Sequence, residues 1–288
     1  MICRLCYCDH NMASNMFIKI ALWLVLALCF FLFLITSAKA ELQRFEHPIS
    51  TETKNDEPLS LSFLVIGDWG RRGAFNQSQL TSQMGRIGEK LDIDFVVSIG
   101  DNFYDNGLSG EDDTAFEKSF SKIYTVKSLQ KQWYSSKFPH HSSLITTSIL
   151  HDLESAFKKS MAKWKIVVGH HAIRSIGHHG DTQELIRHIL PLLKTYDVDF
   201  YMNGHDHCLE HISDRESPIQ FLTSGAGSKA WRGNIKEENG DGLNFFYDGQ
   251  GFMSVKLTQF EAEIKFYDVH GKVLHGWNKI KQPRHSSV

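Results

Sequence analysis

Cysteine is almost absent from most of this 288-residue chain. A single cysteine, Cys208, lies beyond residue 40, and one cysteine excludes a disulfide framework for residues 41–288. The spacing of the cysteines near the start has no matching second pair, so it does not indicate a zinc site. The cysteines of this early part are Cys3, Cys6, Cys8 and Cys29.

The sequence also lacks an excess of charge of either sign. It has 31 Lys and Arg against 33 Asp and Glu, a formal net charge of -2, so nothing indicates nucleic acid as a partner. Histidine, in contrast, is abundant: there are 16, and eleven of them fall between His140 and His211. Because histidine is the commonest metal ligand and titrates near neutral pH, this clustering favours metal or proton chemistry.

No apolar run is long enough to span a membrane comfortably. The longest, Ile20–Ile35, has 16 residues, whereas a spanning helix needs ~20. Lys19 precedes this run, and Ala38-Lys39-Ala40 follows it with the small residues that a signal peptidase requires. We therefore predict a signal peptide over residues 1–40 that is cut after Ala40; the alternative is a membrane anchor.

The predicted signal peptide has further consequences for the chain. Residues 1–15 form an extension ahead of it, and Met12 or Met16 would be a more ordinary start. Cleavage would leave no membrane anchor and would export the protein, to the extracellular space, the cell wall or the vacuole. Asn76-Gln77-Ser78 is a glycosylation acceptor, with Asn76 as the modified residue, which agrees with export.

Four predicted strands each end in glycine followed by a side chain that can bind a metal. The first two are separated by helical spacing over Gln77–Leu91, so they form a βαβ unit and lie parallel. Ligands of open α/β sheets gather at the carboxyl ends of such strands. The four strands and the residues that follow them are Leu61–Ile66 with Asp68, Asp94–Ile99 with Asp101, Trp164–Val168 with His170, and Asp199–Asn203 with His205 and His207.

The remaining pattern predicts a mixture of helices and strands. Three segments have helical character: Asp112–Tyr124, His151–Lys163 and Thr182–Lys194. Glu261–Tyr267 alternates polar and apolar residues, as a half-buried antiparallel strand does. The other expected features are strands at Ser128–Tyr134, Ile219–Thr223 and Phe252–Leu257, and a glycine-rich surface loop near the site over Ser224–Gly251.

The ordered motifs resemble the calcineurin-like metallophosphoesterases: Gly-Asp-Trp-Gly at 67–70, Gly-Asp-Asn-Phe-Tyr at 100–104, Val-Val-Gly-His-His at 167–171 and Gly-His-Asp-His at 204–207. Tyr104 is the mark of their purple acid phosphatase branch, and the match is closest to the small plant enzymes. It covers residues 59–134 and 151–277. The resemblance implies an α/β (mixed α+β) fold, an αββα two-sheet sandwich flanked by helices, in a single domain over 41–288. It also implies a secreted acid phosphatase that acts on small phosphate monoesters.

The resemblance assigns the ligands of two metals: Asp68, Tyr104 and His207 to ferric iron, His170 and His205 to zinc, manganese or iron, with Asp101 bridging. It makes His179 the histidine that faces the phosphate, a candidate general acid. His171 and His178 are expected to be structural or to support the ligands. His188 and His211 are expected to be satisfied surface or core histidines.

One family motif is missing. The family has a Gly-Asn-His between Tyr104 and His170, whose asparagine completes the second metal site, but no asparagine occurs from Gly107 to Met202. We interpret residues 135–150 as sequence that bridges an internal deletion, in which His140 and His141 could replace the lost ligands. The alternatives are a working or impaired secreted phosphatase, an inactive variant that binds at most one metal or does not fold, and a redox protein whose iron generates reactive oxygen.

Overall fold

The structure is a computed structural model that describes residues 60–136, 147–236 and 241–281. All of these residues belong to the compact unit Glu41–Val288. The predicted signal peptide and the residues His140 and His141 lie outside the described part of the chain. Within that part, no helix is both long enough and apolar enough to cross a membrane.

The described elements alternate between helices and strands in the first half and are mainly strands in the second half. In chain order they are β1 (Leu61–Ile66), α2 (Gln77–Leu91), β2 (Phe95–Ser98), α3 (Thr114–Phe116), β3 (Gln132–Ser135), α4 (Thr147–Lys159), β4 (Ile166–Val168), α5 (Gln183–His188), α6 (Leu190–Thr195), β5 (Phe200–Asn203), β6 (Leu209–Ser213), β7 (Gln220–Ser224), β8 (Leu243–Tyr247), β9 (Gly251–Leu257), β10 (Glu261–Asp268) and β11 (Val273–Ile280).

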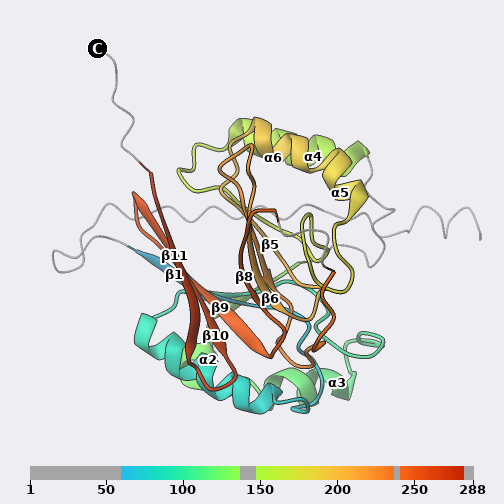
Figure 1. Ribbon diagram of the computed structural model, residues 1–288. Helices are drawn as coiled ribbons and strands as arrows, with labels where there is room; N and C mark the ends of the chain where they lie inside the picture. The colour runs from blue at the N-terminus through green and yellow to red at the C-terminus, as the bar shows by residue number, and fades with distance from the viewer. Residues whose placement is uncertain (1–59, 137–146, 237–240, 282–288) are drawn as a thin grey trace, which may run out of the picture. The chain divides into compact units, whose positions relative to one another are not determined.

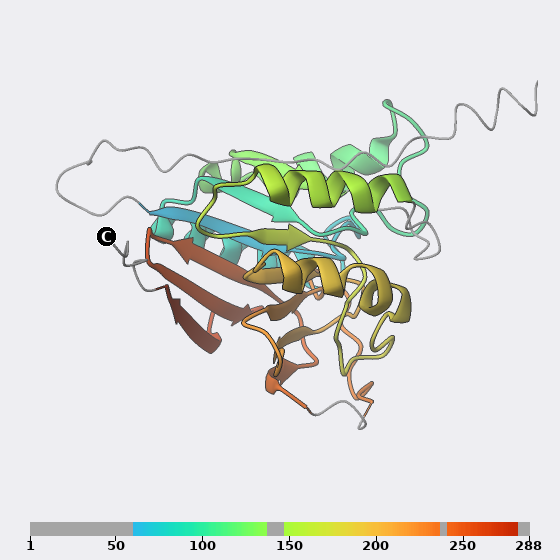
Figure 2. The same cartoon turned by 90° about the horizontal axis from the view of Figure 1, so that it is seen from above.

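Two sheets form the centre of this unit. One has the order β11-β10-β9-β1-β2-β3 and the other β4-β5-β7-β6-β8. Helix α2 covers the outer face of the first sheet, and α4, α5 and α6 lie on the outer face of the second (Figure 1, Figure 2). Because apolar side chains of both sheets also pack against each other, the layers are helix, sheet, sheet, helix, as predicted.

The βαβ unit predicted from the first two motifs is present. Strands β1 and β2 pair in parallel, with Phe63 opposite Phe95, and α2 crosses between them. In the second sheet β4 and β5 are also parallel neighbours, with Val167 opposite Tyr201. The residue that follows each of these four strands therefore lies where the parallel strands of its own sheet end.

Some of the predicted helices are wrong in extent. The segment Asp112–Tyr124 forms only α3 and a following π-helical turn, Glu117–Ser121. The predicted helix over Thr182–Lys194 is two short helices, because Pro191 has no N–H to donate to the preceding turn and is tolerated only at the start of a helix, here the first turn of α6. Helix α4 begins at Thr147 and ends at Lys159, earlier than the expected Lys163.

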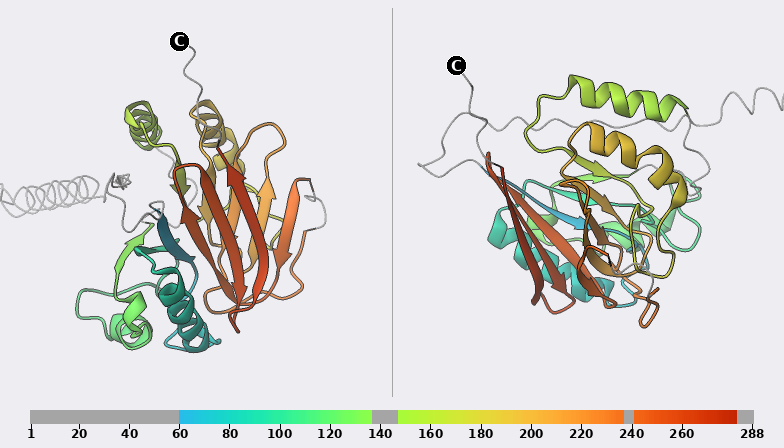
Figure 3. Two further views of the ribbon diagram at one scale, coloured as in Figure 1. Left: turned by 90° about the vertical axis from the view of Figure 1, so that its left-hand side faces the viewer. Right: turned by 45° about the horizontal axis from the view of Figure 1, so that its top comes forward.

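The sequence also failed to predict three strands. Part of the expected loop Ser224–Gly251 is β8, which pairs antiparallel with β6. Strand β6 itself and the long edge strand β11 had no alternating pattern strong enough to be recognised; β11 pairs antiparallel with β10, as Figure 3 shows at the edge of the first sheet. Antiparallel pairing of β10 was predicted and is confirmed.

A pair of histidines joins the two sheets at one side. His211 on β6 lies 3.0 Å from His275 on β11, measured from Nδ1 to Nε2, and its Nε2 lies 2.8 Å from Oε1 of Gln220. His211 is fully buried, whereas His188 is exposed, so the expectation that these two are satisfied core and surface residues is confirmed. Burial is the main reason that the pKa of His211 is lowered from 6.5 to about 4.

This buried pair predicts a loss of stability in acid. A lowered pKa in the folded state means that the neutral imidazole is favoured there, so the stabilisation is complete above pH 6.5 and is lost as the pH falls through about 4. We expect this group to remove about 3 kcal/mol from the free energy of unfolding over that interval. The His211→Asn variant should therefore lose less stability than the wild type on acidification.

Urea unfolding at several pH values between neutral and about pH 4 measures this effect. His188→Asn is the matched control, because it makes the same substitution at a histidine whose side chain is exposed. Equal pH dependence in the wild type and in His211→Asn would contradict the role given to the pair.

Candidate metal centre

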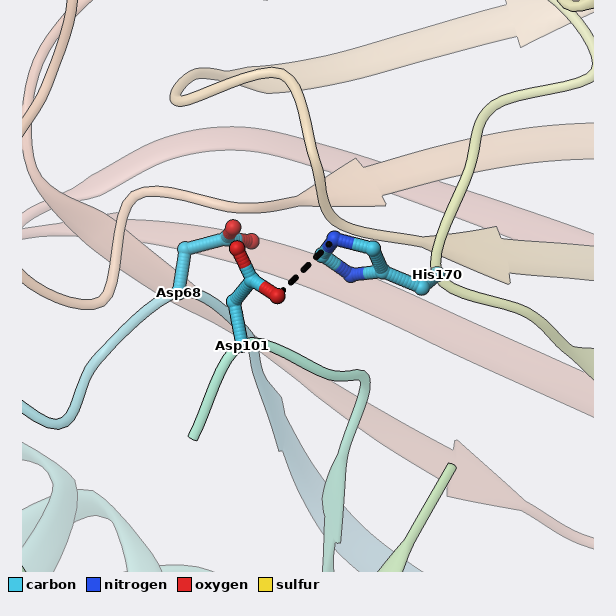
Figure 4. A group of neighbouring side chains, drawn as sticks. All are labelled: Asp68, Asp101 and His170. Carbon is cyan, nitrogen blue, oxygen red and sulfur yellow. Dashed lines mark ion pairs between the residues drawn. The ribbon is translucent and has the colours of Figure 1, made fainter. Parts of the chain in front are cut away.

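The predicted ligands come together where the strands end. Asp68 follows β1, Asp101 follows β2 and His170 follows β4, and their ligand atoms lie within 4.8 Å of one another. Figure 4 shows the three side chains pointing toward a common point, with His170 Nε2 3.4 Å from Asp101 Oδ1. The site therefore joins residues from both sheets, each at the carboxyl end of its strand.

The phenol of Tyr104 connects the carboxylates. Its hydroxyl lies 2.9 Å from Oδ1 of Asp68, 3.0 Å from Oδ2 of Asp101 and 3.1 Å from Nε2 of His207. Nε2 of His207 also lies 3.3 Å from Oδ1 of Asp68. Burial, followed by the two carboxylate charges, raises the pKa of Tyr104 far above its usual value, so the phenol stays protonated unless a cation arrives.

His170 faces the opposite side of Asp101. Its Nδ1 lies 3.0 Å from the carbonyl oxygen of Ile99, which can only accept, so Nδ1 carries the proton. The lone pair of Nε2 then faces the Asp101 carboxylate 3.4 Å away. Two electron donors held face to face suit a cation between them, so this donor set fits a bound metal.

His205 completes a row of imidazoles. Its ring lies 5.1 Å from His170, 4.2 Å from His171 and 3.9 Å from His179, measured between ring centroids. Burial, and then the neighbouring His171, lower the pKa of His205 to about 2. The imidazole is therefore neutral, which is the form that binds a metal.

The backbone at three of these positions is in the left-handed region. The φ values are 58° for Asp68, 46° for Asp101 and 69° for His205. Such conformations are unfavourable for residues other than glycine and concentrate at functional sites. The N–H of His205 donates to Oδ2 of Asp68 at 3.0 Å, so the strained turns support each other across the two sheets.

His179 lies at the rim of this cluster. Its ring stacks on His205 and is exposed, and its backbone N–H donates to Oδ1 of the buried Asp206 at 2.7 Å. Glu210 holds the same loop by accepting from the N–H of Ile176 at 2.8 Å, and burial raises the pKa of Glu210 to about 8. Two buried carboxyl groups thus fix the loop that presents His179.

Sequence reasoning missed Trp231. The centroids of its indole and of the His207 ring are 3.9 Å apart, and the two ring planes meet at 13°. The backbone N–H of Trp231 donates to the carbonyl of His207 at 3.2 Å. His178 contacts the edge of the same indole at 5.1 Å. The glycine-rich loop was expected near the site, but its sequence gave no reason to select this aromatic residue.

Strand β3 ends beside the site, and the Gly-Asn-His motif was expected to follow it. Ser135 pairs with Ser98 of β2, two residues before Gly100, so β3 ends at the same sheet edge as Asp101. The Nδ2 of Asn102 donates to Oγ of Ser135 at 2.7 Å, and the N–H of Ser136 donates to the carbonyl of Ser98 at 2.9 Å.

The two-sheet fold and the cluster of carboxylates, phenol and imidazoles define a metallophosphoesterase. A profile of the calcineurin-like phosphoesterase family matches residues 122–209. The chain is 50% identical over 330 aligned positions to purple acid phosphatase 17 of Arabidopsis thaliana, covering 92% of this chain and 96% of that protein. It therefore belongs to the purple acid phosphatases, which are acid phosphatase hydrolases.

Solved structures agree with this fold. GAP50, the anchor in the inner membrane complex of Plasmodium, superposes with a TM-score of 0.69 at 22% identity, covering 78% of this chain and 90% of that one. Purple acid phosphatase PPD1 from yellow lupin seeds gives a TM-score of 0.62 at 14% identity, covering 77% and 54%. The predicted family, fold class and enzyme class are confirmed.

Proposed function

We propose that this chain hydrolyses phosphate monoesters at a centre of two metals, built from six side chains at the ends of strands. The observation that carries this proposal is the position of Asp101. Its carboxylate lies 3.0 Å from the hydroxyl of Tyr104 on one side and 3.4 Å from Nε2 of His170 on the other. A carboxylate that lies between two different sets of donor atoms can bridge two metals, and the family implies a binuclear centre.

The two donor sets differ in kind, which supports a mixed pair of metals. Phenolate and carboxylate oxygens are hard ligands that suit ferric iron, whereas imidazoles suit zinc, manganese or ferrous iron. The proposed ligands are Asp68, Tyr104 and His207 for ferric iron and His170 and His205 for the divalent metal, with Asp101 shared.

Metals bound in these positions would supply a hydroxide nucleophile and neutralise charge on the phosphate oxygens. The chain's own residues do the rest. Asp101 keeps the two donor sets in a fixed relation, and the loop held by Asp206 presents His179 to the rim of the site. We assign His179 the transfer of a proton to the leaving oxygen, since its exposed ring can approach a bound ester.

We further propose that this centre hydrolyses phosphate esters more slowly than those of other family members, because its second metal lacks one ligand. The Gly-Asn-His motif is absent from the sequence, although β3 ends where it would begin. The alignment with the Arabidopsis enzyme runs over 330 positions, more than the 288 residues of this chain, so that relative has residues where this chain has none. An internal deletion near residues 135–150 accounts for both observations.

Hydrolysis of p-nitrophenyl phosphate by the purified protein tests the proposed activity. We expect none from metal-free protein, measurable hydrolysis after loading with ferric iron and zinc, and loss of both activity and visible colour in Asp68→Asn. Hydrolysis that persists without metal, or that is unchanged in Asp68→Asn, would contradict the metal-dependent mechanism.

Trp231 should contribute to holding the metal through His207. Within the described residues, the buried Nδ1 of His207 has no hydrogen-bond partner, so stacking on Trp231 replaces the contact that usually orients a ligating histidine. We expect Trp231→Ala to weaken iron binding by ~10–100-fold and Trp231→Phe to retain most of it. Competition with a chelator measures both affinities; equal losses in the two variants would contradict a role for stacking.

We also propose export through cleavage after Ala40, with glycosylation at Asn76. The Asn76 side chain is exposed directly before α2, where an oligosaccharide has room. Amino-terminal sequencing of protein secreted from plant cells should begin at Glu41, and Asn76→Gln should remove one glycan from its mass. An intact Ile20–Ile35 segment in the mature protein would contradict cleavage.

A further inference from the structure

The guanidinium group of Arg71 lies directly over the ring of Tyr104. Its Cζ is 3.6 Å from the ring centroid, and only 16% of the Arg71 side chain is exposed. Its nearest ion-pair partner is Asp105, at 3.5 Å, whose side chain is 86% exposed and therefore well screened by water. The Tyr104 ring is thus the nearer of two aromatic rings beside Arg71, since the ring of Phe75 is 5.6 Å from Cζ.

Buried contacts hold Arg71 in this place. The N–H of Tyr104 donates to the carbonyl of Gly70 at 3.0 Å, so the loop that carries Arg71 crosses the loop that carries the tyrosine. A side chain at Gly70 would collide with the backbone of Asn102, which explains glycine at the crossing. The backbone N–H of Arg71 donates at 3.1 Å to Oε1 of the fully buried Gln77.

We propose that Arg71 is a positioning and tuning residue for Tyr104. It lies over the phenol ring and stabilises the negative charge that the ring carries when Tyr104 is bound to ferric iron. This inference rests on the proposed ferric site. A planar cation over an aromatic face is attracted by it, and the attraction grows when the ring is anionic.

The contact has a spectroscopic consequence. Tyrosinate bound to ferric iron absorbs visible light by transferring charge from the ring to the metal. A cation over the ring lowers the energy of the donor electrons and so raises the energy of this transition. Removing Arg71 should therefore move the band to longer wavelength, by roughly 5–20 nm for a cation–π contact of ordinary strength.

The test compares visible spectra of ferric-loaded wild type, Arg71→Met, Arg71→Lys and the control Arg72→Met. Arg72 is adjacent and exposed, so its replacement removes the same charge from the same loop without touching the ring. We expect the longer-wavelength shift in Arg71→Met, a smaller one in Arg71→Lys, which keeps the charge but not the plane, and none in Arg72→Met. Far-ultraviolet circular dichroism identifies any variant that fails to fold.

Two results separate this inference from the proposed function. If the wild type shows the band and folded Arg71→Met shows it at the same wavelength, the role of Arg71 is overturned and the ferric site stands. An equal shift of the band in Arg72→Met has the same meaning. A wild type that binds iron without a tyrosinate band would overturn the proposed ferric ligands and this inference together. If Arg71→Met does not fold, the comparison of Arg71→Lys with wild type decides the question in the same way.

Discussion

Replacing Asp101 with asparagine is expected to lower kcat/KM for a phosphate monoester by roughly 1000-fold or more. Asp101 is the carboxylate that contacts both Tyr104 and His170, so its loss removes negative charge from both halves of the proposed centre. The neutral amide keeps the size of the side chain but cannot bridge two cations. We therefore expect loss of metal as well as loss of rate.

The measurement is kcat/KM together with metal content, for wild type and Asp101→Asn at equal metal supply. Asp112→Asn is the matched control, because Asp112 is an exposed aspartate outside the cluster and its replacement changes the net charge equally. Retention of more than a tenth of the activity by Asp101→Asn would show that Asp101 does not bridge.

Restoring the missing motif is expected to have a large effect in the opposite direction. We predict that the Gly-Asn-His segment of a plant relative, inserted after Ser136, raises kcat/KM by ~10–100-fold and lowers the divalent metal needed for half of full activity. The position follows from β3, whose end is fixed beside Asp101 by pairing of Ser135 with Ser98.

An insertion of equal length in which both polar residues of the motif are alanine is the control. It restores chain length without the amide and imidazole, so it separates a missing ligand from a missing strand. If both insertions activate equally, the deletion impairs the sheet rather than the metal site. If neither changes the activity, residues already present replace the lost motif, and His140 and His141 become the residues to mutate.

The sequence predicted the placement of the ligands better than it predicted the sheets. Asp68 and Asp101 could be placed together because a short βαβ unit has only one favoured geometry. Strands β6, β8 and β11 were not predicted, because none has a clear alternation of polar and apolar residues; their side chains contact residues far away in the chain instead, as His211 of β6 contacts His275 of β11. Local patterns do not contain that information.

The same reason explains what was missed in the site. Glycine followed by aspartate or histidine at a strand end is a local signal, and it selected Asp68, Asp101, His170 and His205 as candidate ligands. The family resemblance added Tyr104 and His207, and the structure places both beside Asp68. Trp231 and Arg71 act through stacking on residues far away in the chain, at His207 and Tyr104. Only the folded arrangement of the loops shows which aromatic residue or arginine makes such a contact.

The most direct test of the whole account is a titration of zinc or manganese into protein that already carries one ferric ion, with hydrolysis of p-nitrophenyl phosphate as the readout. The iron side has all of its proposed ligands, whereas the second metal keeps only Asp101, His170 and His205. We therefore predict that iron binds first, with a visible tyrosinate band, and that activity rises only when the divalent metal is in large excess. Full activity at one equivalent of divalent metal, or no iron binding at all, would contradict the account.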